Sequence, residues 1–155
     1  MAEIESRDNG KTIREELAMN RGAGSSSQYA ASLADNITSD VPTGAVPATV
    51  SMTVSEPLGV VGIQTPWNRP IVNLAQSGAP ALAAGNTIVV KPSEYAPCST
   101  LEFAALASEA GVPDGVVNVV VAADAASAVR LGIRRGLRLR PRVWQHRPSE
   151  PLSPR

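Results

Sequence analysis

Two short polar motifs interrupt apolar stretches of the 155-residue chain: Thr-Pro-Trp-Asn at residues 65–68 and Lys-Pro-Ser-Glu at residues 91–94. The side-chain amide of Asn68 could donate a hydrogen bond to an oxygen that gains negative charge when a nucleophile adds to a carbonyl group. The Glu94 carboxylate could accept both hydroxyls of a ribose, and Lys91 could donate to that sugar or to a nearby phosphate. These residue types favour a nucleotide site beside a site for a carbonyl compound.

Each motif also has an interpretation without chemistry. Asn68 could cap the helix expected after it, because asparagine is a favoured N-cap and proline is tolerated in the first helical turn. Trp67 could be buried for packing alone. Lys91 could be a solvated lysine and Glu94 a glutamate at a helix start. The residues alone leave both interpretations open.

The apolar pattern around the motifs predicts a strand, a helix and a second strand. Residues 59–65 are rich in β-branched side chains and suit a strand buried on both faces, which Pro66 ends. Apolar side chains at helical spacing follow over residues 71–82, and residues 86–90 form a second apolar run. A crossover of this length is a right-handed βαβ unit in a parallel sheet. Both motifs then follow the carboxyl ends of adjacent strands, where open α/β sheets bind ligands.

A second helix and a third strand extend this unit. The helix is expected to begin near Pro97, with Ser99 and Glu102 spaced as a capping box, and residues 116–121 are expected to be a strand. The predicted fold class is α/β, with a partial doubly wound parallel sheet of order βαβαβ. No Gly-x-Gly-x-x-Gly or Walker loop occurs, so glycine spacing gives no evidence of phosphate binding.

Helices are predicted before the sheet. Residues 2–7 form a helix closed by the Asn9-Gly10 turn signal, and residues 12–20 form a second, short helix. Residues 22–27 are small and are interpreted as a loop or a helix start, while residues 29–34 again have helical spacing.

Two further segments separate these helices from the sheet. Residues 41–47 contain two prolines and a glycine and are expected to be a loop. Residues 49–54 alternate enough to form a strand.

Composition excludes several classes of protein. The single cysteine, Cys98, excludes an internal disulfide and a cysteine-based metal cluster, and His146 has no partner at metal-site spacing, so no metal is expected. No run approaches eighteen apolar residues and Met1 is followed by acidic and polar residues, so no membrane association and a cytoplasmic location are expected.

The formal net charge of zero hides two different segments. Residues 1–129 carry six Lys and Arg against thirteen Asp and Glu, a net charge of −7. Residues 130–155 carry eight Arg against one Glu, a net charge of +7. We expect residues 1–121 to form one partial domain and residues 122–155 to be a disordered Arg- and Pro-rich tail, which the abrupt change suggests is a product of a shifted reading frame.

The chain resembles the aldehyde dehydrogenase superfamily. The resemblance rests on Pro66-Trp67-Asn68, on the run Ala-Pro-Ala-Leu-Ala-Ala-Gly-Asn at residues 79–86, and on Lys91-Pro92-Ser93-Glu94, in the family's order and spacing. It extends from the segment at residues 5–11 to about Val120. Because members are roughly three times this length, the chain looks like an interior fragment of an enzyme that oxidises an aldehyde to a carboxylic acid.

The resemblance also implies site residues and a cofactor. Asn68 takes the role of oxyanion donor. The residues that match the family's cofactor site are Thr65, Pro66, Trp67, Lys91, Ser93 and Glu94. NAD is preferred because Glu94 would repel a 2′-phosphate, although the small Ser93 leaves NADP open. Residues 49–54 match an oligomerisation arm, which implies a homo-oligomer in full-length relatives.

The family's nucleophilic cysteine and its general-base glutamate come from a later part of the fold. Cys98 lies at a predicted helix start, where the dipole could lower its pKa, but in a different context, so we expect it to be a small packing residue. The chain is therefore expected to bind NAD weakly and not to turn over an aldehyde. The alternatives are a non-enzymatic nucleotide-binding or subunit-association remnant and, ranked last, nucleic-acid binding through the arginines of the tail.

Overall fold

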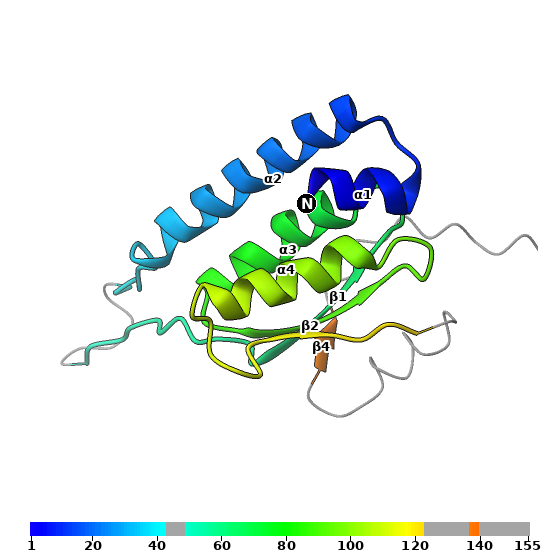
Figure 1. Ribbon diagram of the computed structural model, residues 1–155. Helices are drawn as coiled ribbons and strands as arrows, with labels where there is room; N and C mark the ends of the chain where they lie inside the picture. Colours follow the sequence, from blue (N-terminus) through cyan, green and yellow to red (C-terminus); the bar gives the residue numbers. More distant parts are fainter. Residues whose placement is uncertain (43–48, 123–136, 140–155) are drawn as a thin grey trace, which may run out of the picture.

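The structure is a computed structural model that describes residues 1–42, 49–122 and 137–139. Helices precede and then alternate with strands (Figure 1). Their bounds are α1 Ala2–Asn9, α2 Ile13–Ala34, β1 Val60–Thr65, α3 Pro70–Ala83, β2 Thr87–Pro92, α4 Cys98–Glu109, β3 Val117–Val119 and β4 Leu137–Leu139.

The strands form one parallel sheet in the order β3-β2-β1-β4. Strands β1 and β2 pair along their whole length, from Val60 opposite Thr87 to Thr65 opposite Pro92. This arrangement confirms the predicted α/β class and the partial doubly wound sheet. Strand β4 corrects one prediction, because its three residues belong to the segment expected to be disordered and pair with β1. The rest of that segment from residue 123 onward lies outside the described residues.

The helices form two layers on one side of the sheet (Figure 1). Helix α3 packs on β1 and β2, and α4 packs beside it on β3. Helix α2 lies along α3, and α1 contacts both α2 and α4. The N-terminal helices are therefore an outer layer over the two crossover helices.

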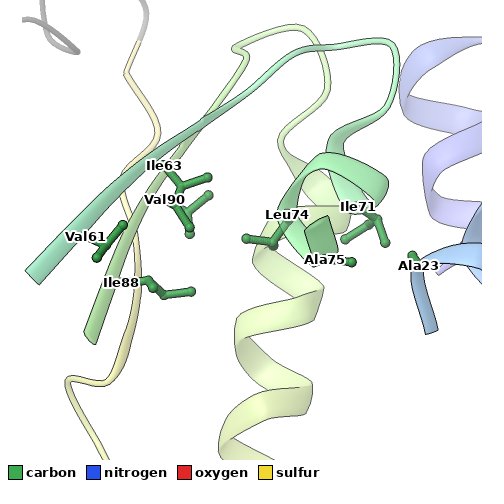
Figure 2. Packing of buried hydrophobic residues seen from close by; sticks show 8 residues of the cluster. All are labelled: Ala23, Val61, Ile63, Ile71, Leu74, Ala75, Ile88 and Val90. Atoms are coloured by element: carbon green, nitrogen blue, oxygen red, sulfur yellow. The ribbon is translucent and has the colours of Figure 1, made fainter. Parts of the chain in front are cut away.

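The core lies between the sheet and α3. Val61 and Ile63 of β1 and Ile88 and Val90 of β2 are at most 6% exposed, and Leu74 of α3 points toward them (Figure 2). On the other side of α3, Ile71 and Ala75 lie toward Ala23 of α2. The spacing of these apolar residues is the pattern that predicted the βαβ unit.

Asn86 links the end of α3 to the start of β1. Its side chain accepts a hydrogen bond from the Gly59 N–H at 3.0 Å and donates one to the Ala81 carbonyl at 2.9 Å. Gly85 precedes it with a φ of 79°, which suits glycine and ends the helix. This geometry explains why a Gly-Asn pair closes the small-residue run.

Helix α1 confirms the first predicted helix, whereas α2 corrects the second. Gly10 follows α1 at a φ of 80° and its N–H reaches the Ser6 carbonyl, as the turn signal predicted. Helix α2 is continuous from Ile13 to Ala34, so the loop interpretation of residues 22–27 is wrong. The helix continues through its glycines because Ala23 packs into the core, and this contact outweighs weak local propensity.

The predicted strand at residues 49–54 is also wrong. These residues are extended but pair with no other strand of the described chain. Instead, the Thr53 N–H donates to the Asp40 carbonyl at 2.8 Å, and the Asp40 N–H donates to the Thr53 hydroxyl at 2.9 Å. Alternation alone predicted the conformation but could not supply a neighbouring strand. Of the predicted loop at residues 41–47, residues 43–47 lie outside the described part.

Candidate active site at the sheet edge

The two polar motifs meet at the carboxyl ends of β1 and β2. Thr65 lies opposite Pro92 in the last paired position of the two strands. Directly beyond it, the Ser93 N–H donates a hydrogen bond to the Thr65 carbonyl oxygen at 3.0 Å. The parallel register therefore brings both motifs to one edge, as the pattern predicted.

Lys91 and Glu94 form an ion pair at this edge. The Lys91 Nζ lies 3.8 Å from a Glu94 carboxylate oxygen and donates to the Pro92 carbonyl at 3.2 Å. Lys91 is only 8% exposed, so the interpretation of a solvated lysine is wrong. Glu94 is exposed and lies in the turn before α4 rather than in its first turn. A buried ammonium thus holds a carboxylate that remains accessible to a ligand.

Asn68 does not cap α3. The helix begins at Pro70, its N-cap position is Arg69, and no side chain of either residue caps it. Asn68 is exposed, and its carbonyl oxygen accepts a hydrogen bond from the Lys11 Nζ. Its side-chain amide makes no hydrogen bond within the described residues. The amide is therefore available to an oxygen of a bound molecule.

The other residues of the first motif differ in exposure. Trp67 is 54% exposed, so it does not serve packing alone. Pro66 is exposed, while Thr65 is 4% exposed and its hydroxyl has no partner in the part of the chain that the structure describes. Only the backbone of Thr65 takes part in the edge geometry.

Two buried glutamates lie behind this edge, and the sequence patterns did not reveal them. Glu5 and Glu16 are each 1% exposed. One oxygen of Glu5 accepts from the Ile71 N–H at 3.1 Å and the other from the Asn20 side chain at 2.7 Å. Burial raises the pKa of Glu5, the neighbouring Glu16 raises it further, and these two hydrogen bonds partly oppose the rise. No periodic signal joins Glu5 to a residue 66 positions later.

Lys11 joins the glutamates to the first motif. Its Nζ lies 3.7 Å from Glu16 and also donates to the Asn68 carbonyl. Glu16 in addition accepts from the Asn9 side chain at 2.9 Å. The polar cluster therefore connects the first two helices to the loop that carries Asn68.

Cys98 begins α4 and departs from two expectations. It is exposed, so it is not a packing residue. Its N–H donates to an Asp8 carboxylate oxygen at 2.8 Å. The pKa of the thiol is raised, chiefly by hydrogen bonding to Asp8 and then by burial, rather than lowered by the helix dipole. The predicted capping box is absent as well, because α4 has no side-chain cap and Ser99 is buried.

A groove of about 700 Å³ lies away from the sheet edge, between the C-terminal parts of α2 and α3. Tyr29, Leu33, Pro80 and Ala83 are among the residues that line it. It is at the opposite end of α3 from Asn68, so it is not the site formed by the two motifs. Among the described residues, no cluster of three His, Cys, Asp or Glu side chains could hold a metal ion, and no helix has the length and hydropathy to cross a membrane.

The architecture is that of an open α/β protein with polar motifs at the carboxyl edge of a parallel sheet. The chain belongs to the aldehyde dehydrogenase family, whose model matches residues 1–134. This match runs past Val121, and the boundary between residues 1–121 and residues 122–155 stays a prediction.

Relatives and solved structures support the assignment. The chain is 42% identical to a betaine aldehyde dehydrogenase of Bacillus subtilis over 139 residues. The aligned region covers 90% of this chain and 28% of that relative. It is 41% identical to the NADP/NAD-dependent aldehyde dehydrogenase PuuC of Escherichia coli, over 77% of this chain and 24% of the relative. The crystal structure of an NAD-dependent aldehyde dehydrogenase from Sinorhizobium meliloti superposes with a TM-score of 0.84 at 33% identity, covering 88% of this chain and 27% of the other.

A betaine aldehyde dehydrogenase from Staphylococcus aureus in complex with NAD+ superposes with a TM-score of 0.75 at 38% identity, over 77% of this chain and 24% of that one. The chain thus spans about a quarter of the length of the relatives it matches.

Proposed function

We propose that the sheet edge binds the adenosine ribose of NAD and that Asn68 stabilises the oxyanion in the NAD-dependent oxidation of an aldehyde. The observation that carries this proposal is the meeting of the two motifs, with the accessible Glu94 carboxylate held by buried Lys91. Glu94 would accept the two ribose hydroxyls, and Lys91 would donate to the ribose or to a phosphate. The NAD+ complex of the Staphylococcus aureus relative supports the choice of cofactor.

NAD, when bound, supplies the acceptor for the hydride that leaves the carbonyl carbon. The chain's own contribution is the Asn68 amide, which would donate to the carbonyl oxygen as negative charge develops there. Turnover also needs an activated thiolate. The one cysteine of the chain, Cys98, is held next to Asp8, which raises its pKa and disfavours the thiolate. We therefore propose that these 155 residues bind NAD weakly and do not oxidise aldehydes.

Calorimetric titration of the chain with NAD tests this proposal. We expect a dissociation constant near or above about 1 mM, equivalent to about 4 kcal/mol of binding free energy. The Glu94→Gln variant should weaken binding further, because it removes the charged acceptor of the ribose hydroxyls, whereas Glu109→Gln, at the exposed end of α4, should not. Micromolar binding, or equal binding by both variants, would contradict the proposed cofactor site. Aldehyde-dependent NADH formation would contradict the proposed inactivity.

A second candidate function is subunit association without catalysis, and the extended segment after residue 48 favours it. Val50, Met52 and Val54 alternate along this segment and are 80%, 63% and 67% exposed. An extended segment with exposed apolar side chains can add to the sheet of another chain. The double variant Met52→Ser with Val54→Ser should shift light-scattering masses toward the monomer, whereas Leu106→Ser on α4 should not. An unchanged mass would exclude this segment as the interface.

A further inference from the structure

The two helices that follow the site strands begin without capping side chains of their own. The N-cap positions are Arg69 for α3 and Pro97 for α4, and neither makes a side-chain cap hydrogen bond. The first N–H groups of a helix have no intrahelical acceptor, so they need one from elsewhere. Each of these helices begins directly after the loop that carries one of the two motifs.

Helix α1 supplies one such acceptor to each of the two helices. Glu5 accepts from the Ile71 N–H at 3.1 Å, and Asp8 accepts from the Cys98 N–H at 2.8 Å. The two carboxylates are three residues apart, so they lie on one face of α1. One rigid turn of helix therefore holds the starts of α3 and α4 at a fixed distance from each other.

Lys11 adds a third connection, directly to the residue proposed for catalysis. Its Nζ donates to the Asn68 carbonyl, and the Lys11 side chain is 21% exposed. The backbone of Lys11 is itself held, since its carbonyl accepts from the Ser6 hydroxyl at 2.6 Å and its N–H donates to the Asn9 side chain at 3.0 Å. The lysine is thus anchored to α1 on one side and to the Asn68 loop on the other.

We propose that Glu5, Asp8 and Lys11 are positioning residues that hold the Asn68 loop and the Glu94 turn in one fixed relative geometry. The inference rests on the proposed function, because it concerns the residues that would face the substrate and the cofactor. Each of the three contacts a backbone group, either of the Asn68 loop or of the helix start that follows one of the motifs. Because α1 contacts the starts of both helices, it would fix the spacing between Asn68, the oxyanion donor, and Glu94, the ribose acceptor. A bound aldehyde and NAD require such a fixed spacing.

The test uses NMR spectra of the full 155-residue chain without NAD or aldehyde, so its result does not depend on the proposed ligands. In Lys11→Met, the backbone and side-chain amide resonances of Asn68 should shift and broaden, because the carbonyl loses its donor. Lys11→Arg should restore them in part, since it keeps a donor of similar reach. Arg14→Met, an exposed cation at the start of α2, is the matched control and should leave Asn68 unchanged.

The caps are tested by hydrogen exchange in the same spectra. Asp8→Ala should speed exchange of the Cys98 amide by about tenfold, the effect of losing one hydrogen bond, and should also shift the Asn68 resonances through α1. Asp8→Asn should restore both, because its oxygen can still accept. A cap with only a structural role would change Cys98 alone. Unchanged Asn68 resonances in both Lys11→Met and Asp8→Ala would overturn the proposal; if Asp8→Ala does not fold, Lys11→Met decides it alone.

Discussion

Lys91 and Asn68 show what single residues reveal before a structure is known. The motif containing Lys91 could be placed from its position after an apolar run, and the structure keeps it at the predicted sheet edge. Its burial could not be predicted, because that depends on how neighbouring segments fold over the strand end. Asn68 is a plausible cap by residue type, yet the N-cap of α3 is Arg69, one position further along the chain. Residue types predicted the chemistry of the site but not the residue at which α3 begins.

Glu5 makes a prediction at this scale, because burial and the nearby Glu16 raise its pKa above the ordinary value of 4.5. The folded protein then holds the Glu5 proton more tightly than the unfolded chain does. Its contribution to stability is complete below the unfolded pKa and is lost as pH rises through the folded pKa. The free energy of unfolding of the wild type, minus that of Glu5→Gln, should therefore fall as pH increases from about 4 to 7.

Urea denaturation across this pH range measures the difference, with Glu3→Gln as the control on the exposed side of α1. The groups close to Glu5 are Glu16, the Asn20 amide and the Ile71 N–H, and all three are retained in the variant, as is Lys11, which pairs with Glu16. A difference that stays flat would show that the pKa of Glu5 is unchanged by folding, and one that rises with pH would show that it is lowered; either result would contradict the prediction.

Elements were predicted well where apolar spacing met a clear stop signal. The strand–helix–strand pattern, the Gly10 and Gly85 helix ends and the order of elements are all present in the structure. Two errors, the break in α2 and the strand at residues 49–54, have one cause. Both depend on partners distant in sequence: Ala23 gains a core to pack against, whereas residues 49–54 join none of the strands in the part of the chain that the structure describes.

Two glycine substitutions should change stability in opposite directions, one within the continuous helix α2 and one directly after α3. A Cβ added at Gly22 meets no atom within 4 Å, so Gly22→Ala should raise the free energy of unfolding by about 0.5–1 kcal/mol through improved helix propensity. Gly85 has a φ of 79°, and its added Cβ would lie 3.0 Å from Pro57 Cγ. Gly85→Ala should therefore lower the free energy of unfolding, by about 1–2 kcal/mol or more. Chemical denaturation of both variants checks the signs; a loss of stability in Gly22→Ala would place a break in α2.

At the scale of the whole molecule, the sequence predicted the fold class, which the parallel sheet confirms, whereas the implied homo-oligomer stays a prediction. The described helices lie on one side of the sheet, and Val50, Met52 and Val54 are exposed among the described residues. The charge difference between the two segments, −7 against +7, offers another cause of self-association. Composition could not decide between apolar and electrostatic attraction, because that depends on which side chains are exposed.

Salt separates these two causes. Apolar association should persist or strengthen when sodium chloride is raised from 0.1 to about 1 M, since screening shortens the Debye length from about 10 Å to about 3 Å and weakens only the attraction between charges. We expect light-scattering masses above that of the monomer at both salt concentrations. Dissociation at high salt would assign the association to the oppositely charged segments, and a monodisperse monomer in both would contradict self-association altogether.

The contacts of α1 also bear on the order in which the chain folds. Its acceptors bind N–H groups 66 and 90 residues further along the chain, so these contacts close long loops and cannot form until α3 and α4 exist. During synthesis, α1 leaves the ribosome before α3 and α4 and has to wait for Cys98 before both of its contacts can form. The sheet and its crossover helices would then assemble first, and the two loops at the sheet edge would reach their final geometry only in the last step of folding.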